Sequence, residues 1–332
     1  MKIIKYAGYD RFQCLAQHCP DSCCKEWDVL VDDESARQYR ALTGPLGDRL
    51  RQVLREDEDG NTYMSIENRR CPMWQEDGLC RIQSELGHDA LCQTCRDFPR
   101  LTHDYGDFVE YQLELSCPEA ARLLLTSPEE PPVVITLPGC PEVEYDRDAM
   151  DILLKSRKEI LSILQMPRPT EEILAIALFY GYHVQAQLYG AAADHFDPEA
   201  ALADGKALAV PADPASIAAF FSTLEILTPQ WKQRLAHTYP GEWSAPMLAL
   251  FRYGVERYWL QAVSDRDLIA RVKMILLSCL LVKHLGGDPV ETAQLYSKEI
   301  ENSTENVEDI LDGVFVDPAL QDDRLLGLLL LA

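Results

Sequence analysis

The sequence lacks the glycine motifs that mark common nucleotide and hydrolase sites. Its 332 residues contain no G-x-x-x-x-G-K-[ST], no G-x-G-x-x-G and no G-x-S-x-G pattern. A phosphate loop, a dinucleotide-binding turn and the nucleophile of an α/β-hydrolase are therefore not expected. No fixed-period repeat is present either, which argues against a solenoid.

Long apolar runs are also missing. Residues 1–10 (MKIIKYAGYD) carry no apolar stretch of secretory-signal length, the run Ile275–Val282 is broken by Ser278, and the run Leu325–Ala332 is short. None of these stretches can span a bilayer. We therefore expect a cytoplasmic protein that has no membrane partner. Because thiols stay reduced in the cytoplasm, the 11 cysteines favour metal binding over disulfides.

Basic residues are few. Lysine and arginine together number 31, against 54 aspartate and glutamate residues, so the formal net charge is −23 and the pI is near 4.6. Such a chain repels phosphate backbones, and we therefore expect no nucleic-acid partner. The acidity is typical of a soluble surface, and it would also suit a basic partner surface or a lysine presented for chemistry.

The cysteines are unevenly distributed along the chain. Nine of the eleven lie between Cys14 and Cys117. This Cys-rich part ends at the proline-rich stretch 127–132 (SPEEPP), which is typical of a linker or turn. We therefore predict a Cys-rich region over residues 1–130 that binds a metal ion or an iron–sulfur cluster, followed by a helical domain over residues 131–332.

The spacing of apolar residues predicts a mainly α protein, with minor β-structure in the Cys-rich region and an irregular multi-helix domain after it. Strands are predicted at 62–66 and 108–115, and these two would pair in one small sheet. Ser116 is expected to cap a helix that ends near residue 125, with Glu119 completing a capping box. The remaining helices are predicted at 33–42, 46–55, 146–165, 170–193, 214–227, 229–239, 245–263, 265–285, 289–302, 304–314 and 318–332.

Eight cysteines form clusters with the spacing of metal ligands. The spacings are Cys14-x4-Cys19-x3-Cys23-Cys24, then Cys71-x8-Cys80, then Cys92-x2-Cys95. Ligand pairs from separate segments commonly close on one zinc ion or one iron–sulfur cluster. Either centre takes four thiolates, which leaves a second centre or reactive spare thiols open. Inert packing of all eight would be unusual, although free cysteine is often buried.

Other residues near these clusters are candidates of lower specificity. His18 lies inside the first cluster, where it could be a ligand or an exposed neighbour. Cys117 is expected at a helix start, where amide dipoles lower a thiol pKa, so it is a ninth ligand, a reactive thiol or a packing residue. The arginines of residues 96–100 (RDFPR) could bind an anion or form surface salt bridges. We assign Cys140 and Cys279 to packing.

The ordered motif resembles the flagellin lysine-N-methylase family, which belongs to the wider group of zinc- or iron-chelating CxxCxxCC proteins. The resemblance covers about residues 1–127 and includes Phe12, Trp27, Cys71-Pro72, the stretch 92–100 and the stretch 115–122 (LSCPEAAR). It implies an enzyme that transfers a methyl group from S-adenosylmethionine to lysine side chains of flagellin, and a bound [4Fe–4S] cluster. The motif positions are Cys14, Cys19, Cys23, Cys24, Cys71, Cys80, Cys92, Cys95 and Cys117.

Methyl transfer to lysine requires a neutral amine, so a base is expected near the motif. The candidates are Glu110, Glu114, Glu119 and Tyr111. Zinc remains the alternative to the iron–sulfur cluster. Two alternatives to the enzyme also stay open, namely a zinc- or iron-binding protein of the same group without activity, and an interaction module that zinc staples to a helical scaffold.

Overall fold

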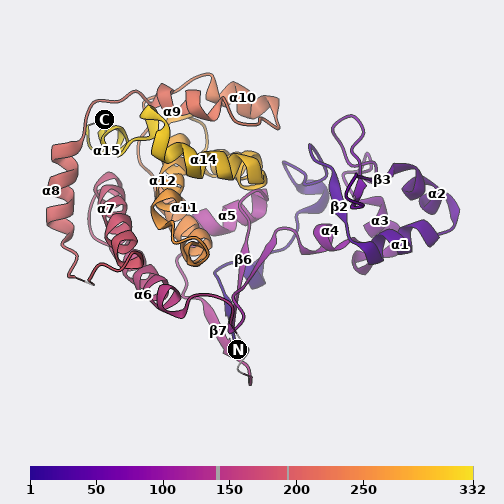
Figure 1. The fold of residues 1–332 in the computed structure, drawn as a ribbon. Helices are drawn as coiled ribbons and strands as arrows, with labels where there is room; N and C mark the ends of the chain where they lie inside the picture. Colours follow the sequence, from indigo (N-terminus) through magenta and orange to yellow (C-terminus); the bar gives the residue numbers. More distant parts are fainter. Residues whose placement is uncertain (140–142, 193, 332) are drawn as a thin grey trace.

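Helices make up most of the structure, as the sequence predicts. The computed structural model describes residues 1–139, 143–192 and 194–331. Figure 1 shows two bodies, which we call the Cys-rich body (residues 12–99) and the helical body (the helices that follow residue 117). A four-stranded sheet that contains the N-terminus lies beside the junction of the two bodies (Figure 1).

The helices differ from the predicted set mainly in the Cys-rich body and around residue 200. In the described residues the α-helices are α1 (Asp33–Ala41), α2 (Gly44–Val53), α3 (Arg81–Leu86), α4 (Gln93–Asp97), α5 (Pro118–Thr126), α6 (Arg147–Ile163), α7 (Thr170–Leu188), α8 (Pro198–Leu208), α9 (Pro214–Phe221), α10 (Pro229–Leu235), α11 (Ala245–Tyr258), α12 (Leu268–His284), α13 (Pro289–Tyr296), α14 (Thr304–Val316) and α15 (Asp322–Leu330). A π-helical turn, η5 (Ser297–Glu301), extends α13. No helix in these ranges combines the length and the apolar composition needed to cross a membrane.

Several helices begin with the same local signal. Asp197, Asp213 and Asp288 precede α8, α9 and α13, and each carboxylate accepts a hydrogen bond from a backbone amide of the first turn. A proline follows each of these aspartates, and its fixed φ suits the first helical position. Helix α8 has this signal but was not predicted, because its alanine-rich sequence has little contrast between an apolar and a polar face.

The strands form two separate sheets. One sheet has the order β5 (Arg100–Asp104), β6 (Phe108–Leu113), β1 (Lys2–Lys5) and β7 (Val133–Thr136), and the other has the order β2 (Val29–Val31), β4 (Thr62–Met64) and β3 (Leu54–Glu56). The predicted pairing of strands 62–66 and 108–115 is wrong, because β4 and β6 lie in different sheets. Strand β4 pairs with β3 and β6 pairs with β5, each across a short turn that costs little loop-closure entropy.

The core of the helical body is centred on α12. Every residue of this helix is buried, and α7, α11 and α14 pack against it. A helix whose sequence is almost uniformly apolar is expected to be buried on all sides. Cys279 is fully buried within α12, which confirms its assignment to packing, whereas Cys140 lies outside the described residues.

A buried ion pair ties the four-stranded sheet to the helical body. Glu110 of β6 is 1% exposed, and the two terminal nitrogens of Arg157 in α6 donate to its two carboxylate oxygens at 2.6 and 2.9 Å. The hydroxyl of Tyr6 donates to the same carboxylate at 3.0 Å. The two nitrogens of Arg157 and the hydroxyl of Tyr6 satisfy the Glu110 carboxylate, whose burial would otherwise lower the stability of the fold.

Replacing Arg157 with Met should lower the free energy of unfolding by about 3–5 kcal/mol, because it leaves the Glu110 carboxylate buried without its cation. Chemical denaturation followed by circular dichroism measures this change. The control is Arg122→Met, which removes the exposed partner of Glu119 and should cost less than about 1 kcal/mol. Equal losses in the two variants would show that the buried pair has no special role.

Candidate functional site

Six of the nine motif cysteines line one cavity of about 360 Å³ in the Cys-rich body. They come from three segments of the chain and are Cys23, Cys24, Cys71, Cys80, Cys92 and Cys95. Much of the remaining wall is apolar and includes Met64, Met73, Ile82 and Leu91. The fold therefore gathers sulfur atoms from distant parts of the sequence around a single space.

Hydrogen bonds that use no thiol hold the three segments together. The amide of Cys71 donates to the carbonyl of Cys24 at 2.8 Å, which joins the first segment to the second. Gly78 has φ +82°, and this left-handed turn reverses the chain within the second segment. The hydroxyl of Thr94 donates to the carbonyl of Leu30 at 2.8 Å, which fixes the third segment. The cavity walls are thus positioned by the backbone.

The cavity thiols form two hydrogen-bonded pairs. Hydrogen bonding between Cys23 and Cys24 lowers the pKa of Cys24 to about 7 and raises the pKa of Cys23. The same interaction between Cys92 and Cys95 lowers the pKa of Cys92 and raises that of Cys95. Burial raises the pKa of Cys71 to about 12. Because desolvation opposes the thiolate form, several of these groups would ionise together only beside a cation.

The other motif residues lie outside this cavity. Cys14 and His18 are exposed and Cys19 is half-buried. Cys117 is buried in an apolar cluster beside Phe12, at the start of α5. Burial raises the pKa of Cys117 to about 11 and outweighs its hydrogen bonds from backbone amides, so the expected lowering of this pKa is wrong.

The metal ligands remain a prediction. Across residues 1–139, 143–192 and 194–331, no group of three or more histidine, cysteine, aspartate or glutamate side chains is arranged to hold a metal ion. The arginines of residues 96–100 also lie outside the cavity lining. Arg96 donates to the carbonyl of Leu91, and Arg100 lies over the ring of Phe12.

The rest of the cavity wall contains residues from within the Cys-rich body and residues from outside it. Trp27 and Phe98 face each other edge to face, with ring centroids 6.2 Å apart. Glu114, at the end of β6, and Asn302, which follows the π-helical turn, complete this wall. Trp27 and Phe98 belong to the sequence motif but were given no role, and Asn302 gave no signal at all because it is remote from the cysteines in sequence.

Of the four predicted bases, Glu114 is the one that the structure places in the cavity wall. It is 7% exposed, and the hydroxyl of Ser116 donates to it at 2.8 Å, so the expected helix cap by Ser116 is wrong. Glu119 pairs with Arg122 instead of closing a capping box. Burial raises the pKa of Glu114, against the opposing charge of Arg257.

The remaining two candidate bases lie elsewhere. Glu110 is committed to Arg157, as described above. Tyr111 packs against Tyr9, with ring centroids 5.4 Å apart. Neither residue belongs to the cavity lining.

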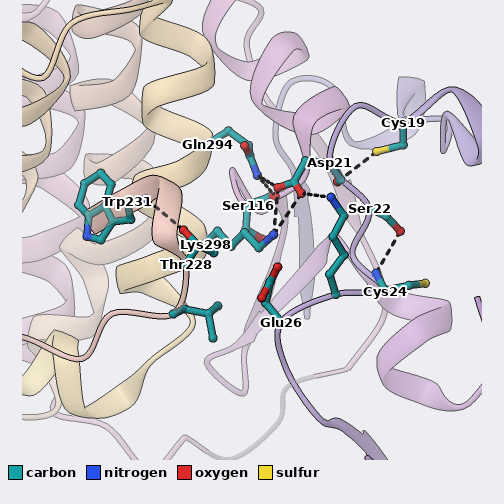
Figure 2. A network of polar contacts seen from close by, with 12 residues as sticks. Cys19, Asp21, Ser22, Cys24, Glu26, Ser116, Thr228, Trp231, Gln294 and Lys298 are labelled. Atoms are coloured by element: carbon teal, nitrogen blue, oxygen red, sulfur yellow. Dashed lines mark hydrogen bonds and ion pairs between the residues drawn. The ribbon is translucent and has the colours of Figure 1, made fainter. Parts of the chain in front are cut away.

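Asp21 docks the first cysteine loop onto the helical body (Figure 2). The ammonium of Lys298, in the π-helical turn, donates to both carboxylate oxygens of Asp21 at 3.0 and 3.2 Å. Lys25 lies 3.0 Å from the same carboxylate. The amide of Gln294 donates to Asp21 at 3.1 Å and to the carbonyl of Ser116 at 2.7 Å. Burial alone would raise the pKa of Asp21, but the two lysines outweigh burial and lower it.

Comparison with known proteins shows which proteins this chain resembles in sequence. The chain is 34% identical over 125 residues to the lysine-N-methylase of Salmonella typhimurium (strain LT2). It is 33% identical over 124 residues to the flagellar biosynthetic protein FliU of Salmonella muenchen, a match that covers 36% of this chain and 73% of that relative. The chain belongs to the flagellin lysine-N-methylase family. The family resemblance expected from the cysteine motif is therefore confirmed.

This member of the flagellin lysine-N-methylase family shares only part of its length with the curated methylases. The match to the Salmonella typhimurium protein covers 36% of this chain and 31% of that relative, and the match to the lysine-N-methylase of Salmonella choleraesuis (strain SC-B67) covers the same shares at 33% identity. No family model matches the chain. No solved structure matches it either.

Replacing Lys298 with Met should lower the free energy of unfolding by about 1.5–3 kcal/mol, because a partly buried carboxylate loses its strongest charged donor. Chemical denaturation measures this loss. Alkylation followed by mass spectrometry should also show faster labelling of Cys24, since the loop is no longer held against the helical body.

The matched control is Lys206→Met, which breaks an exposed pair with Glu172 in the same body and should cost less than about 1 kcal/mol. Labelling of Cys24 should stay at the wild-type rate in this control. Unchanged labelling in the Lys298 variant would mean that Asp21 does not hold the loop.

Proposed function

We propose that this protein is a cytoplasmic, S-adenosylmethionine-dependent methyltransferase that modifies lysine side chains of flagellin, and that its cysteine cavity binds a [4Fe–4S] cluster. The observation that carries the proposal is the similarity to proteins named lysine-N-methylase and FliU. The gathering of six motif cysteines around one cavity supports it from the structural side. The net charge of −23 suits a substrate that presents lysine.

The donor set of the cavity suits a cluster. Six thiols and no histidine line the space, and sulfur-only ligands are typical of iron–sulfur clusters and of structural zinc. Four ligands would be drawn from the six cavity cysteines, whereas Cys14, Cys19 and Cys117 lie outside the cavity. When bound, the cluster would cross-link the three segments of the chain that supply its ligands.

The reaction itself places demands on this chain. The lone pair of the lysine Nζ attacks the methyl carbon of the sulfonium, so that a C–N bond forms while the S–CH₃ bond breaks and S-adenosylhomocysteine leaves. Because a free lysine has a pKa near 10.4, the side chain arrives as an ammonium ion and must first pass a proton to a base or to water, which frees the lone pair. The protein must therefore receive an ammonium ion, hold it beside the donor and exclude water from the reacting atoms.

Anaerobic purification followed by iron, sulfide and zinc analysis tests the centre. We expect a brown protein with broad absorbance near roughly 400 nm and iron and sulfide in equal amounts. Incubation with labelled S-adenosylmethionine and flagellin should then give methyl-lysine by mass spectrometry. A colourless protein with stoichiometric zinc would contradict the cluster and favour a structural zinc ion. An intact centre without methyl transfer would favour a metal-binding protein that is not an enzyme.

Serine replacement of Cys92 or Cys95 should lower metal content and soluble yield together, because ligand loss releases the loop that carries both residues. Metal analysis of the purified variants measures this effect. Cys279→Ala is the matched control, since it removes a buried thiol from α12, far from the cavity in sequence, and should keep full metal content. Unchanged metal in both cavity variants would remove Cys92 and Cys95 from the ligand set.

A further inference from the structure

The cysteine cavity is receptive to a cation because the charged residues in its described lining are acidic. Among the described residues that line it, Asp28 and Glu114 are charged, and none is lysine, arginine or histidine. Asp28 is exposed at the rim, and its carboxylate accepts the backbone amide of Ile66 at 2.7 Å. Glu114 is the acidic group that is buried in this wall.

Glu114 has no cation of its own. None of the ion pairs within the described ranges includes it, and its carboxylate receives the hydroxyl of Ser116. The charge of Arg257 favours the ionised form of Glu114, but its guanidinium donates to Glu301 at 3.0 Å and is already paired there. A buried carboxylate without a counter-ion is unfavourable, so a cation that enters the cavity gains its full attraction.

The neighbouring side chains suit the stem of a lysine. Trp27 and Phe98 line the same cavity as Glu114, with their ring centroids 6.2 Å apart, and the amide of Glu114 donates to the carbonyl of Pro99, next to Phe98, at 2.8 Å. Aromatic faces favour cations and also cover the methylene groups of a lysine side chain. The Nζ of Lys298 lies 6.0 Å from the ring centroid of Trp27, so this ring already interacts with one ammonium.

We infer that Glu114, Trp27 and Phe98 form the receiving site for the substrate lysine, with the Glu114 carboxylate paired to the incoming ammonium and the two rings flanking its methylene stem. This assignment rests on the proposed function for the identity of the lysine. It places the substrate lysine in the cavity that the thiols also line, because Glu114 and Asn302 belong to the same lining.

Binding measured without methyl transfer tests the assignment. The probes are a flagellin peptide that contains one lysine and the same peptide with that lysine acetylated, titrated calorimetrically into the anaerobically purified protein. We expect the wild type to prefer the lysine peptide by about tenfold or more, and Glu114→Gln to lose this preference, since one charge-assisted hydrogen bond disappears. Equal binding of both peptides by the wild type would overturn the assignment.

Two further variants sharpen the result. Glu119→Gln is the matched control, because this half-buried glutamate lies five positions away and pairs with the exposed Arg122, and it should keep the wild-type preference. Asn302→Lys should block the lysine peptide while Glu114 stays in place, because it adds a competing ammonium to the same wall. If Glu114→Gln fails to fold, an unaltered preference in Asn302→Lys would still count against the site.

The outcomes separate this assignment from the proposed function. Iron and sulfide content should be the same in wild type and Glu114→Gln, so a loss of peptide preference reports on lysine rather than on the centre. A lysine preference that depends on Glu114, found together with no methyl transfer, would uphold the receiving site and contradict the methyltransferase. Methyl transfer with equal KM in wild type and Glu114→Gln would uphold the methyltransferase and contradict the receiving site.

Discussion

The contact between Asp21 and Lys298 joins the two bodies, and the position of the first cysteine loop depends on it. The two residues are 277 positions apart in sequence, yet the ammonium reaches both carboxylate oxygens. A partly buried ion pair stabilises a fold only when its remaining hydrogen-bonding capacity is also satisfied. Lys25 and Gln294 meet that condition here, and Gln294 also binds the backbone next to Cys117. The position of the first cysteine loop is therefore fixed relative to α5 as well as to α13.

The π-helical turn explains how one short segment serves several neighbours. A π turn inserts a residue into a helix and redirects the side chains that follow it, and such turns occur frequently at functional sites. In this turn Lys298 points to Asp21, while Glu301 accepts hydrogen bonds from Arg257 and from Tyr258 at 2.8 Å. Asn302, directly after the turn, reaches the cysteine cavity. The helical body thus helps to shape the site rather than only supporting it.

The sequence predicted the parts of this arrangement that depend on local signals. The cysteine clusters, the mainly α fold and most long helices follow from spacing and apolar periodicity. Strand pairing was not predictable, because β4 and β6 alternate in the same way, and each pairs both with a neighbour across a short turn and with a strand that is remote in sequence. Ser116 looked like a cap, but Cys117 is the residue that precedes the first turn of α5, and the Ser116 hydroxyl donates to Glu114. Lys298 and Asn302 gave no signal, since their roles arise from contacts between distant segments.

The charges around the cavity show why a lysine would be chosen over a neutral side chain. Glu301 is balanced by Arg257 at hydrogen-bond distance, whereas Glu114 lies buried nearby with a hydroxyl as its donor. If a lysine or arginine of the chain formed an ion pair with Glu114, the carboxylate would attract an incoming cation only weakly. Because that cation is missing, the attraction of the carboxylate remains available to a group that enters from solution. Selectivity for an ammonium then comes from a charge that has no ion-pair partner among the described residues, in a cavity whose other walls are mostly aromatic, aliphatic and sulfur-containing side chains.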